Sequence, residues 1–152
     1  MIPALQPIYS NLKGMVSNQD VKIIDQAFLF AEKKHKGQKR KSGEDYILHP
    51  LRVAIETSKL KLDTSSVVTA LLHDVLEDTK TTKDEIKKMF GEDVLFLVES
   101  LSHLTQLKRK ANYKNKTINR LENLRNLILS SSKDVRVILI KIIDRLDNMR
   151  SI

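Results

Sequence analysis

The sequence has no cysteine and no tryptophan, and it has only four glycines and three prolines among 152 residues. The absence of cysteine excludes disulfide bonds and thiolate metal sites and is typical of a reducing compartment, so we expect the cytoplasm. No apolar run approaches the roughly 20 residues of a membrane-spanning helix. Residues Met1–Lys13 lack the basic and apolar regions of a secretory signal. We therefore expect no membrane association.

Glycine and proline are both absent between Pro50 and Gly91, and again after Gly91. Stretches without these residues favour helices, and capping signals begin at Ser17 and at Thr82. The β-branched run Val135–Ile143 would also suit a strand, but its apolar pattern continues at helical spacing to Met149. We predict one all-α domain over residues 1–152, with helices that start near residues 17 and 63 and that cover 51–60, 82–91, 92–107, 117–131 and 134–150.

The chain is basic, with 27 lysines and arginines against 19 aspartates and glutamates and a net charge of +8. Much of the excess lies in Lys33–Lys41 and Lys108–Lys116. Such charge favours nucleic acid, an acidic membrane face or a phosphorylated small molecule, or it serves solubility alone. Three tyrosines and four phenylalanines form no aromatic platform, and no recognition-helix pattern occurs, so nucleic acid is not an expected partner.

Four ionisable residues stand close together in the segment Leu71–Thr79, namely His73, Asp74, Glu77 and Asp78. On one continuous helix, positions three and four apart share a face, so these side chains are expected to gather on one side. A solvated face would account for Glu77 and Asp78. It accounts less well for His73 and Asp74, which lie inside an apolar run where a bound cation would offset the cost of burying charge. A metal site and an ordinary polar face both remain open on this pattern.

Two further positions are candidates for the same site. Asp144 interrupts an apolar stretch, where a buried carboxylate must be paired to ionise, and Asp147, Asn148 and Ser151 follow on the same stripe. A surface helix with ordinary ion pairs is the alternative. His49 stands just before Pro50, and a lone loop histidine is commonly structural or merely exposed.

Taken in order, these residues resemble a known family. His49, His73-Asp74 and Asp144 match the H…HD…D signature of HD-domain phosphohydrolases. Three longer segments resemble RelA/SpoT-type alarmone enzymes: Arg40–Pro50 is similar to RKSGEPYxxHP, Leu72–Thr79 to LHDVxEDT, and 133–150 to KDxRVxLxKxxDRLHNMR. The likeness extends from about Ile24 to Ser151 and implies a single HD-domain helical bundle.

The resemblance also implies a reaction and a set of residues. It implies metal-dependent hydrolysis of the 3′-pyrophosphate of (p)ppGpp, which yields GDP or GTP and pyrophosphate in the stringent response. The implied ligands of one divalent ion, which is usually Mn²⁺ in this family, are His49, His73, Asp74 and Asp144. Glu77 and Asp78 match the pair that positions and deprotonates water. The residues that match contacts to the guanine nucleotide are Arg40, Lys41, Ser42, Asn148 and Ser151.

The chain departs from the family motifs at three places. Asp147 replaces a histidine that is not a metal ligand, so we expect tuning rather than loss of activity. Asp45 replaces a proline, which should loosen its loop, and Ser151 replaces a threonine. Because relatives continue beyond this point, we expect an excised or truncated N-terminal hydrolase domain, with a synthetase domain in the full-length protein.

Two other functions are compatible with the motifs. One is an HD phosphohydrolase that acts on another nucleotide, since the metal core does not select the base. The other is a non-catalytic regulatory HD module of an alarmone synthetase. The presence of all six implied metal and catalytic residues argues against that second reading.

Overall fold

The structure is a computed structural model that describes residues 2–110, 122, 125 and 134–150, except for the side chains of 106–110. The fold is all-α, as predicted, and the described ranges contain no strand, although Lys39 and Asp45 form an isolated antiparallel bridge. The elements are η1 (Pro3–Leu5), α1 (Gln6–Asn11), α2 (Asn18–Lys34), α3 (Leu48–Lys59), α4 (Thr64–Leu72), α5 (Val75–Asp78), α6 (Lys83–Phe90), α7 (Glu92–Lys110) and α9 (Val135–Arg150). None of these helices has the length and hydrophobicity needed to cross a bilayer. The helix predicted over 117–131 lies outside the described residues, apart from Glu122 and Arg125.

Helix starts follow the capping residues identified in the sequence. Ser17 and Thr82 each form a reciprocal capping box, with Asp20 and Glu85 respectively. The Asp63 side chain accepts a hydrogen bond from the backbone N–H of Ser66 and so caps α4. These caps satisfy backbone donors that a helix cannot pair internally. They confirm the predicted starts of α2, α4 and α6.

The predicted continuous helix through the His73-Asp74 pair is wrong. α4 ends at Leu72, and α5 begins only at Val75. The His73 ring places Nδ1 2.7 Å from the carbonyl oxygen of Ala70, which is the acceptor that Asp74 N–H would use in a continuing helix. The side chain thus replaces a backbone hydrogen bond at the break, and both residues lie at a junction between helices.

Two other boundaries differ from the prediction. α3 begins at Leu48 rather than near residue 51, so Pro50 sits in its first turn, where a missing N–H costs nothing. η1 and α1 were not predicted, because both are short and their segment contains Pro3 and Pro7. The fold decides their conformation by burying Leu5 and Ile8 completely. α9, by contrast, is the predicted helix rather than a strand.

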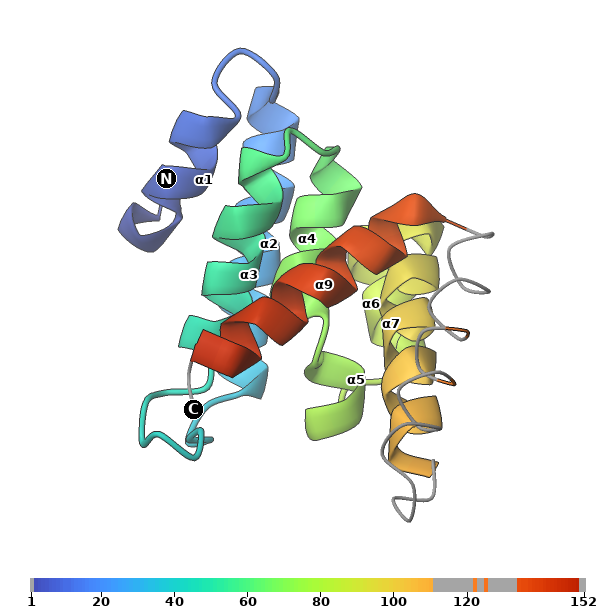
Figure 1. The fold of residues 1–152 in the computed structure, drawn as a ribbon. Coiled ribbons are helices and arrows are strands. Elements are labelled where there is room, and N and C mark those ends of the chain that lie inside the picture. The colour runs from blue at the N-terminus through green and yellow to red at the C-terminus, as the bar shows by residue number, and fades with distance from the viewer. Residues whose placement is uncertain (1, 111–121, 123–124, 126–133, 151–152) are drawn as a thin grey trace.

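The core lies between α2, α3, α4 and α7, and α9 packs across α3, α4 and α7 (Figure 1). Its fully buried side chains include Ile24, Val53, Leu71, Leu97 and Ile140, one from each of these helices. The long diagonal of α9 brings its C-terminal half to the start of α3 and to the loop that precedes α3. Residues from distant parts of the sequence therefore meet at one place.

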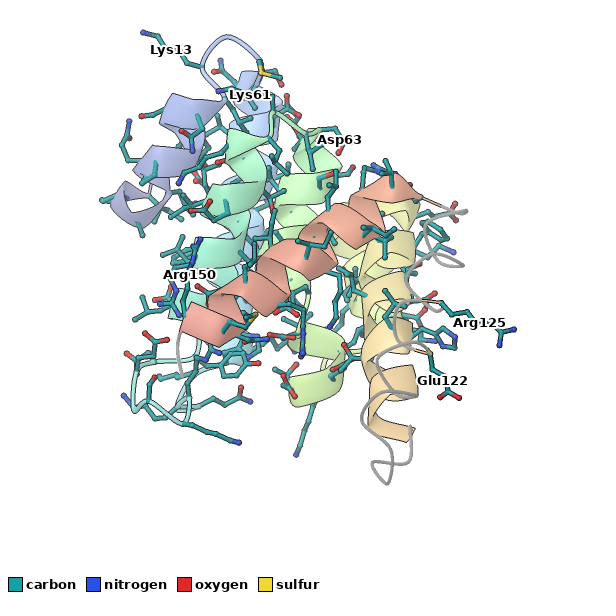
Figure 2. All side chains as sticks on the ribbon, viewed as in Figure 1. Lys13, Lys61, Asp63, Glu122, Arg125 and Arg150 are labelled. Atoms are coloured by element: carbon teal, nitrogen blue, oxygen red, sulfur yellow. The ribbon has the colours of Figure 1, made fainter. Side chains whose placement is uncertain are left out.

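Arg136 fastens the other end of α9. Its guanidinium nitrogens lie 2.7 Å from Asp63, 2.9 Å from Asp93 and 2.7 Å from Asp134. These carboxylates belong to the cap of α4, the first turn of α7 and the residue before α9, and Figure 2 labels Asp63 near this junction. One arginine thus ties three helix starts together.

Candidate metal centre

The four predicted metal ligands converge. His49 comes from the first turn of α3, His73 and Asp74 from the α4–α5 junction, and Asp144 from the middle of α9. Asp144 Oδ1 lies 2.8 Å from His49 Nε2 and 3.2 Å from His73 Nε2, and the two Nε2 atoms are 3.2 Å apart. Asp74 Oδ2 lies 3.0 Å from His73 Nε2 and 3.6 Å from His49 Nε2. Both histidines and Asp144 are buried.

The opposite nitrogens of the two imidazoles have their own partners. His73 Nδ1 faces the Ala70 carbonyl oxygen at 2.7 Å, and His49 Nδ1 faces Asp147 Oδ2 at 2.6 Å. Carbonyl and ionised carboxylate oxygens only accept hydrogen bonds, so each Nδ1 carries a proton. In the neutral ring, each Nε2 then presents a lone pair toward Asp74 and Asp144.

Such a group of nitrogen and oxygen acceptors needs a positive charge at its centre. Burial disfavours imidazolium and would lower the pKa of His73, but Asp74 and Asp144 outweigh it and hold that pKa well above 6.5. Burial also works against ionised Asp74, yet the adjacent His73 lowers its pKa to about 2. Two ionised carboxylates beside two imidazoles form a donor set that suits a divalent first-row cation. Single ligand atoms of His49, His73 and Asp74 all lie within 4.8 Å of one another.

Tyr46 connects this cluster to the predicted catalytic pair. Its hydroxyl oxygen lies 2.8 Å from Asp74 Oδ2 and 2.9 Å from Asp78 Oδ2. Burial and the two carboxylates raise the pKa of Tyr46 far above its ordinary value, so the hydroxyl keeps its single proton, which the two carboxylate oxygens share. The ring stacks on His35 with centroids 4.7 Å apart. Sequence reasoning gave Tyr46 no role, although it stands three residues before His49.

The predicted catalytic residues Glu77 and Asp78 lie on α5, both partly buried. They line a pocket of about 540 Å³ with Lys33, Lys80 and other residues from the end of α2 and the turn after α5. The Gln38 side chain donates to the backbone oxygen of Asp78 at 2.7 Å and fastens α5 to the loop after α2. Asp78 is therefore linked to the His/Asp cluster through Tyr46 and also lines this pocket.

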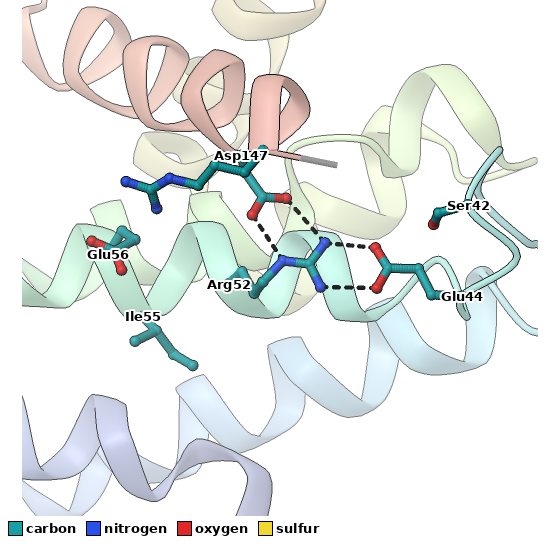
Figure 3. A pocket seen from close by; sticks show the side chains of 7 residues that line it. Ser42, Glu44, Arg52, Ile55, Glu56 and Asp147 are labelled. Atoms are coloured by element: carbon teal, nitrogen blue, oxygen red, sulfur yellow. Dashed lines mark hydrogen bonds and ion pairs between the residues drawn. The ribbon is translucent and has the colours of Figure 1, made fainter. Parts of the chain in front are cut away.

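Two of the predicted nucleotide contacts, Arg40 and Asn148, lie beside the cluster near the end of α9. Arg40 donates to Asn148 Oδ1 at 2.7 Å and to Asp147 Oδ2 at 3.2 Å, and Asn148 Nδ2 lies 3.4 Å from Asp144 Oδ1. Lys41 and Ser42 are exposed on the loop before α3. Ser42 lines a pocket of about 400 Å³ that is shown in Figure 3. Ser151 lies outside the described residues.

The same pocket contains an ion-pair chain that the sequence did not reveal. Arg52 lies between Asp147 and Glu44, with Nε 2.8 Å from Asp147 Oδ1 and Nη2 2.6 Å from Glu44 Oε1 (Figure 3). Arg52 stands three residues after His49, but no sequence pattern pairs it with Asp147, which is 95 positions away. Asp147 thus contacts a candidate ligand and two arginines at once.

The helical bundle and the His/Asp cluster define a class of protein. Residues 27–152 match the family model described as HD domain, and this chain belongs to the HD-domain family.

Named relatives agree with the RelA/SpoT resemblance. A protein of Aquifex aeolicus (strain VF5) called guanosine-3′,5′-bis(diphosphate) 3′-pyrophosphohydrolase is 46% identical over 134 residues, 88% of this chain and 18% of its own length. The bifunctional (p)ppGpp synthase/hydrolase SpoT of Escherichia coli (strain K12) is 44% identical over 141 residues, 93% of this chain and 20% of its own length. The chain thus spans about a fifth of these curated relatives.

A solved structure is similar as well. It is described as a metazoan ortholog of SpoT that hydrolyzes ppGpp and plays a role in starvation responses. It superposes with a TM-score of 0.63 at 30% identity, over 84% of this chain and 68% of that chain. This likeness confirms the predicted family and fold.

Proposed function

We propose that this chain is a metal-dependent hydrolase that removes the 3′-pyrophosphate of (p)ppGpp and releases GDP or GTP and pyrophosphate in the stringent response. The observation that carries the proposal is the convergence of His49, His73, Asp74 and Asp144 beside Asp78. Relatives named for this reaction and this substrate support it. We propose further that residues 1–152 form one hydrolase domain, that the chain acts in the cytoplasm, and that a synthetase domain accompanies it in the full-length protein.

The proposed cofactor is one divalent ion, Mn²⁺, held by His49, His73, Asp74 and Asp144. A mixed imidazole and carboxylate set suits a borderline first-row ion, and no thiolate competes in a chain without cysteine. When bound, such an ion lowers the pKa of water and offsets charge on phosphoryl oxygens.

The chain's own residues supply the proton transfer in this proposal. Asp78 accepts a proton from the attacking water, because its carboxylate lies next to the cluster and opens into the pocket that it lines with Glu77. The Tyr46 hydroxyl orients Asp78 by the hydrogen bond at 2.9 Å. Glu77, on the same turn of α5, orients the water.

The substrate side of the proposal uses the end of α9 and the loop before α3. Arg40 suits a phosphate because its forked donors match phosphoryl oxygens. Lys41 and Ser42 are exposed and free to approach the nucleoside, whereas Asn148 is positioned by Arg40. Ser151 completes the proposed nucleotide contacts. A substrate phosphate at Arg40 must compete with Asp147, which already binds its guanidinium.

The proposal is tested by incubating the purified chain with ppGpp, in Mn²⁺ and in EDTA, and measuring pyrophosphate and GDP. We expect both products in Mn²⁺ and neither in EDTA. Parallel reactions with GTP and ATP test whether another nucleotide is the substrate. Hydrolysis of those nucleotides but not ppGpp would favour the alternative phosphohydrolase, and Mn²⁺ binding without any hydrolysis would favour a regulatory module.

A further inference from the structure

We propose that Asp147 is a positioning residue of the metal centre, which holds the His49 ring so that Nε2 faces the other ligands. The inference rests on the proposed metal site. In this proposal Asp147 contributes to metal affinity, whereas the sequence alone suggested only that it tunes activity.

The contact between Asp147 and His49 is buried and short. Asp147 is 7% exposed and His49 is 2% exposed, and Asp147 Oδ2 lies 2.6 Å from His49 Nδ1. The carboxylate accepts the Nδ1 proton, which leaves Nε2 as the atom that faces Asp144 at 2.8 Å. A flipped ring or the other tautomer would lose this hydrogen bond in a place that water reaches poorly.

The two ligand histidines are therefore oriented by unequal partners. The second partner of His73 is the neutral carbonyl of Ala70, at 2.7 Å, which is supplied by its own helix. The partner of His49 is a charged side chain from α9, 98 positions away. A carboxylate partner raises the basicity of an imidazole ligand, and removal of such partners usually costs about 10–100-fold in metal affinity.

Two arginines hold the Asp147 carboxylate in place. Arg52 approaches both of its oxygens, at 2.8 and 3.2 Å, and Arg40 approaches Oδ2 at 3.2 Å. Arg52 is held in turn by Glu44, at 2.6 and 3.1 Å. These cations make a third carboxylate tolerable close to Asp74 and Asp144. Asp147 is thus a fixed part of the site.

The identity of the residue matters because the RelA/SpoT motif has histidine here. A histidine at position 147 could not serve as an anionic acceptor for His49 Nδ1, and it would leave Arg40 and Arg52 without their shared carboxylate. We infer that this chain's metal centre depends on Asp147. Asp147→His is therefore expected not to restore the binding that Asp147→Asn is expected to lose, because a neutral ring leaves both arginines without an anion.

The test is Mn²⁺ binding by the full chain, measured by calorimetry and by the loss of the free-ion resonance signal. Asp147→Asn is expected to weaken binding about 10-fold or more. Asp134→Asn removes another partly buried, arginine-paired carboxylate at the far end of α9 and is expected to stay within about 2-fold of wild type. Arg52→Gln breaks an Asp147 ion pair but keeps the His49 contact, so it is expected to weaken binding less than Asp147→Asn.

The outcomes distinguish failure of the proposed metal centre from failure of the proposed role of Asp147. If wild type binds no Mn²⁺, the proposed metal centre itself is overturned. If wild type binds Mn²⁺ and Asp147→Asn binds it equally well, only the role of Asp147 is overturned. Equal weakening by Arg52→Gln and Asp147→Asn would also overturn it, because the ion-pair chain rather than the His49 contact would then be responsible.

A second measurement needs no substitution. Nitrogen–proton spectra of wild type are expected to show a strongly deshielded proton on His49 Nδ1, as a hydrogen bond to a carboxylate requires. Should Asp147→Asn fail to fold, this signal decides the question, and its absence in wild type would overturn the proposal.

Discussion

At the residue scale, the site depends on which atom of each side chain faces the centre. His73 is oriented by a carbonyl of its own helix, and Asp74 is held by the Tyr46 hydroxyl. His73 and Asp74, which are proposed to bind the cation, are thus each oriented by a hydrogen bond to another residue. Substitution of a proposed ligand and substitution of a residue that orients one should therefore have different effects.

Replacement of Asp74 by alanine is expected to abolish Mn²⁺ binding and ppGpp hydrolysis, because it removes one of two ionised carboxylates from the cluster. Glu77→Ala is expected to keep Mn²⁺ binding and to lower kcat by about 100-fold, because the attacking water loses the side chain that orients it. Calorimetry and steady-state kinetics on both variants test this. Normal hydrolysis by Asp74→Ala would show that Asp74 is not a ligand.

Tyr46→Phe is expected to lower kcat with little change in the unfolding temperature. Phenylalanine keeps the stack on His35 but loses the hydroxyl that lies 2.8 Å from Asp74 and 2.9 Å from Asp78. Kinetics at saturating Mn²⁺ and thermal unfolding of the same sample separate the two effects. A kcat equal to that of wild type would mean that the Tyr46 hydroxyl does not orient Asp78 for catalysis.

At the element scale, α9 is fixed at both ends by arginines from different positions. Arg136 binds Asp63, Asp93 and Asp134 at its start, while Arg52 of α3 binds Asp147 near its end. Between these anchors, Ile140 and Asp144 face inward. The first anchor lies far from the site and should affect stability alone.

Arg136→Ala is expected to lower the free energy of unfolding by about 1–2 kcal/mol, since it leaves partly buried Asp134 without its guanidinium. Arg145→Ala, on the exposed side of the same helix, is the matched control and should change stability by less than about 0.5 kcal/mol. Urea unfolding measures both. Equal effects of the two variants would contradict the role of Arg136.

The Arg136 cluster also predicts acid sensitivity. Hydrogen bonds from Arg136 lower the pKa of Asp93 and of Asp134, so both stay ionised in the folded chain at pH values where unfolded carboxyls bind protons. Their stabilisation is present above pH about 4, near the ordinary aspartate pKa, and is lost as pH falls through the folded values. Urea unfolding between pH 6 and 3 should therefore show a smaller loss of stability in Arg136→Ala than in wild type. If the free energy of unfolding fell equally with pH in the two chains, Arg136 would not be the cause of the acid sensitivity.

At the scale of the whole molecule, the proposed metal centre joins α3, the α4–α5 junction and α9. The helices that carry these candidate ligands are far apart in the sequence and lie together only in the folded chain (Figure 1). A cation that binds the folded state alone must therefore stabilise the whole bundle.

Removal of the metal is thus expected to destabilise the entire chain. Mn²⁺ at about 100 times its Kd should add about 2.7 kcal/mol to the free energy of unfolding, and EDTA should remove this gain. Thermal unfolding with and without Mn²⁺ measures it, with Asp74→Ala as a control that should show no gain. A gain of equal size in that variant would place the ion elsewhere.

Local signals in the sequence were sufficient for much of the fold, whereas the members of the proposed site were implied by the family resemblance. Ser17, Asp63 and Thr82 cap helices by bonding backbone groups within four residues, so the chain segment itself determines these starts. The motifs around His49 and Asp144 identified residues that the structure brings within 2.8 Å.

The tertiary structure alone decided the features that depend on contacts between residues far apart in the sequence. The break after Leu72 leaves His73 Nε2 facing His49 and Asp144, 24 and 71 positions away, although the apolar pattern of the sequence runs on through His73. The orientation of His49 is set by Asp147, 98 positions away, because a hydrogen bond depends on distance in space and leaves no periodic mark in the sequence. Composition and spacing therefore determined which groups this chain can use, and the packing of α9 across α3 and α4 decided which atoms face one another.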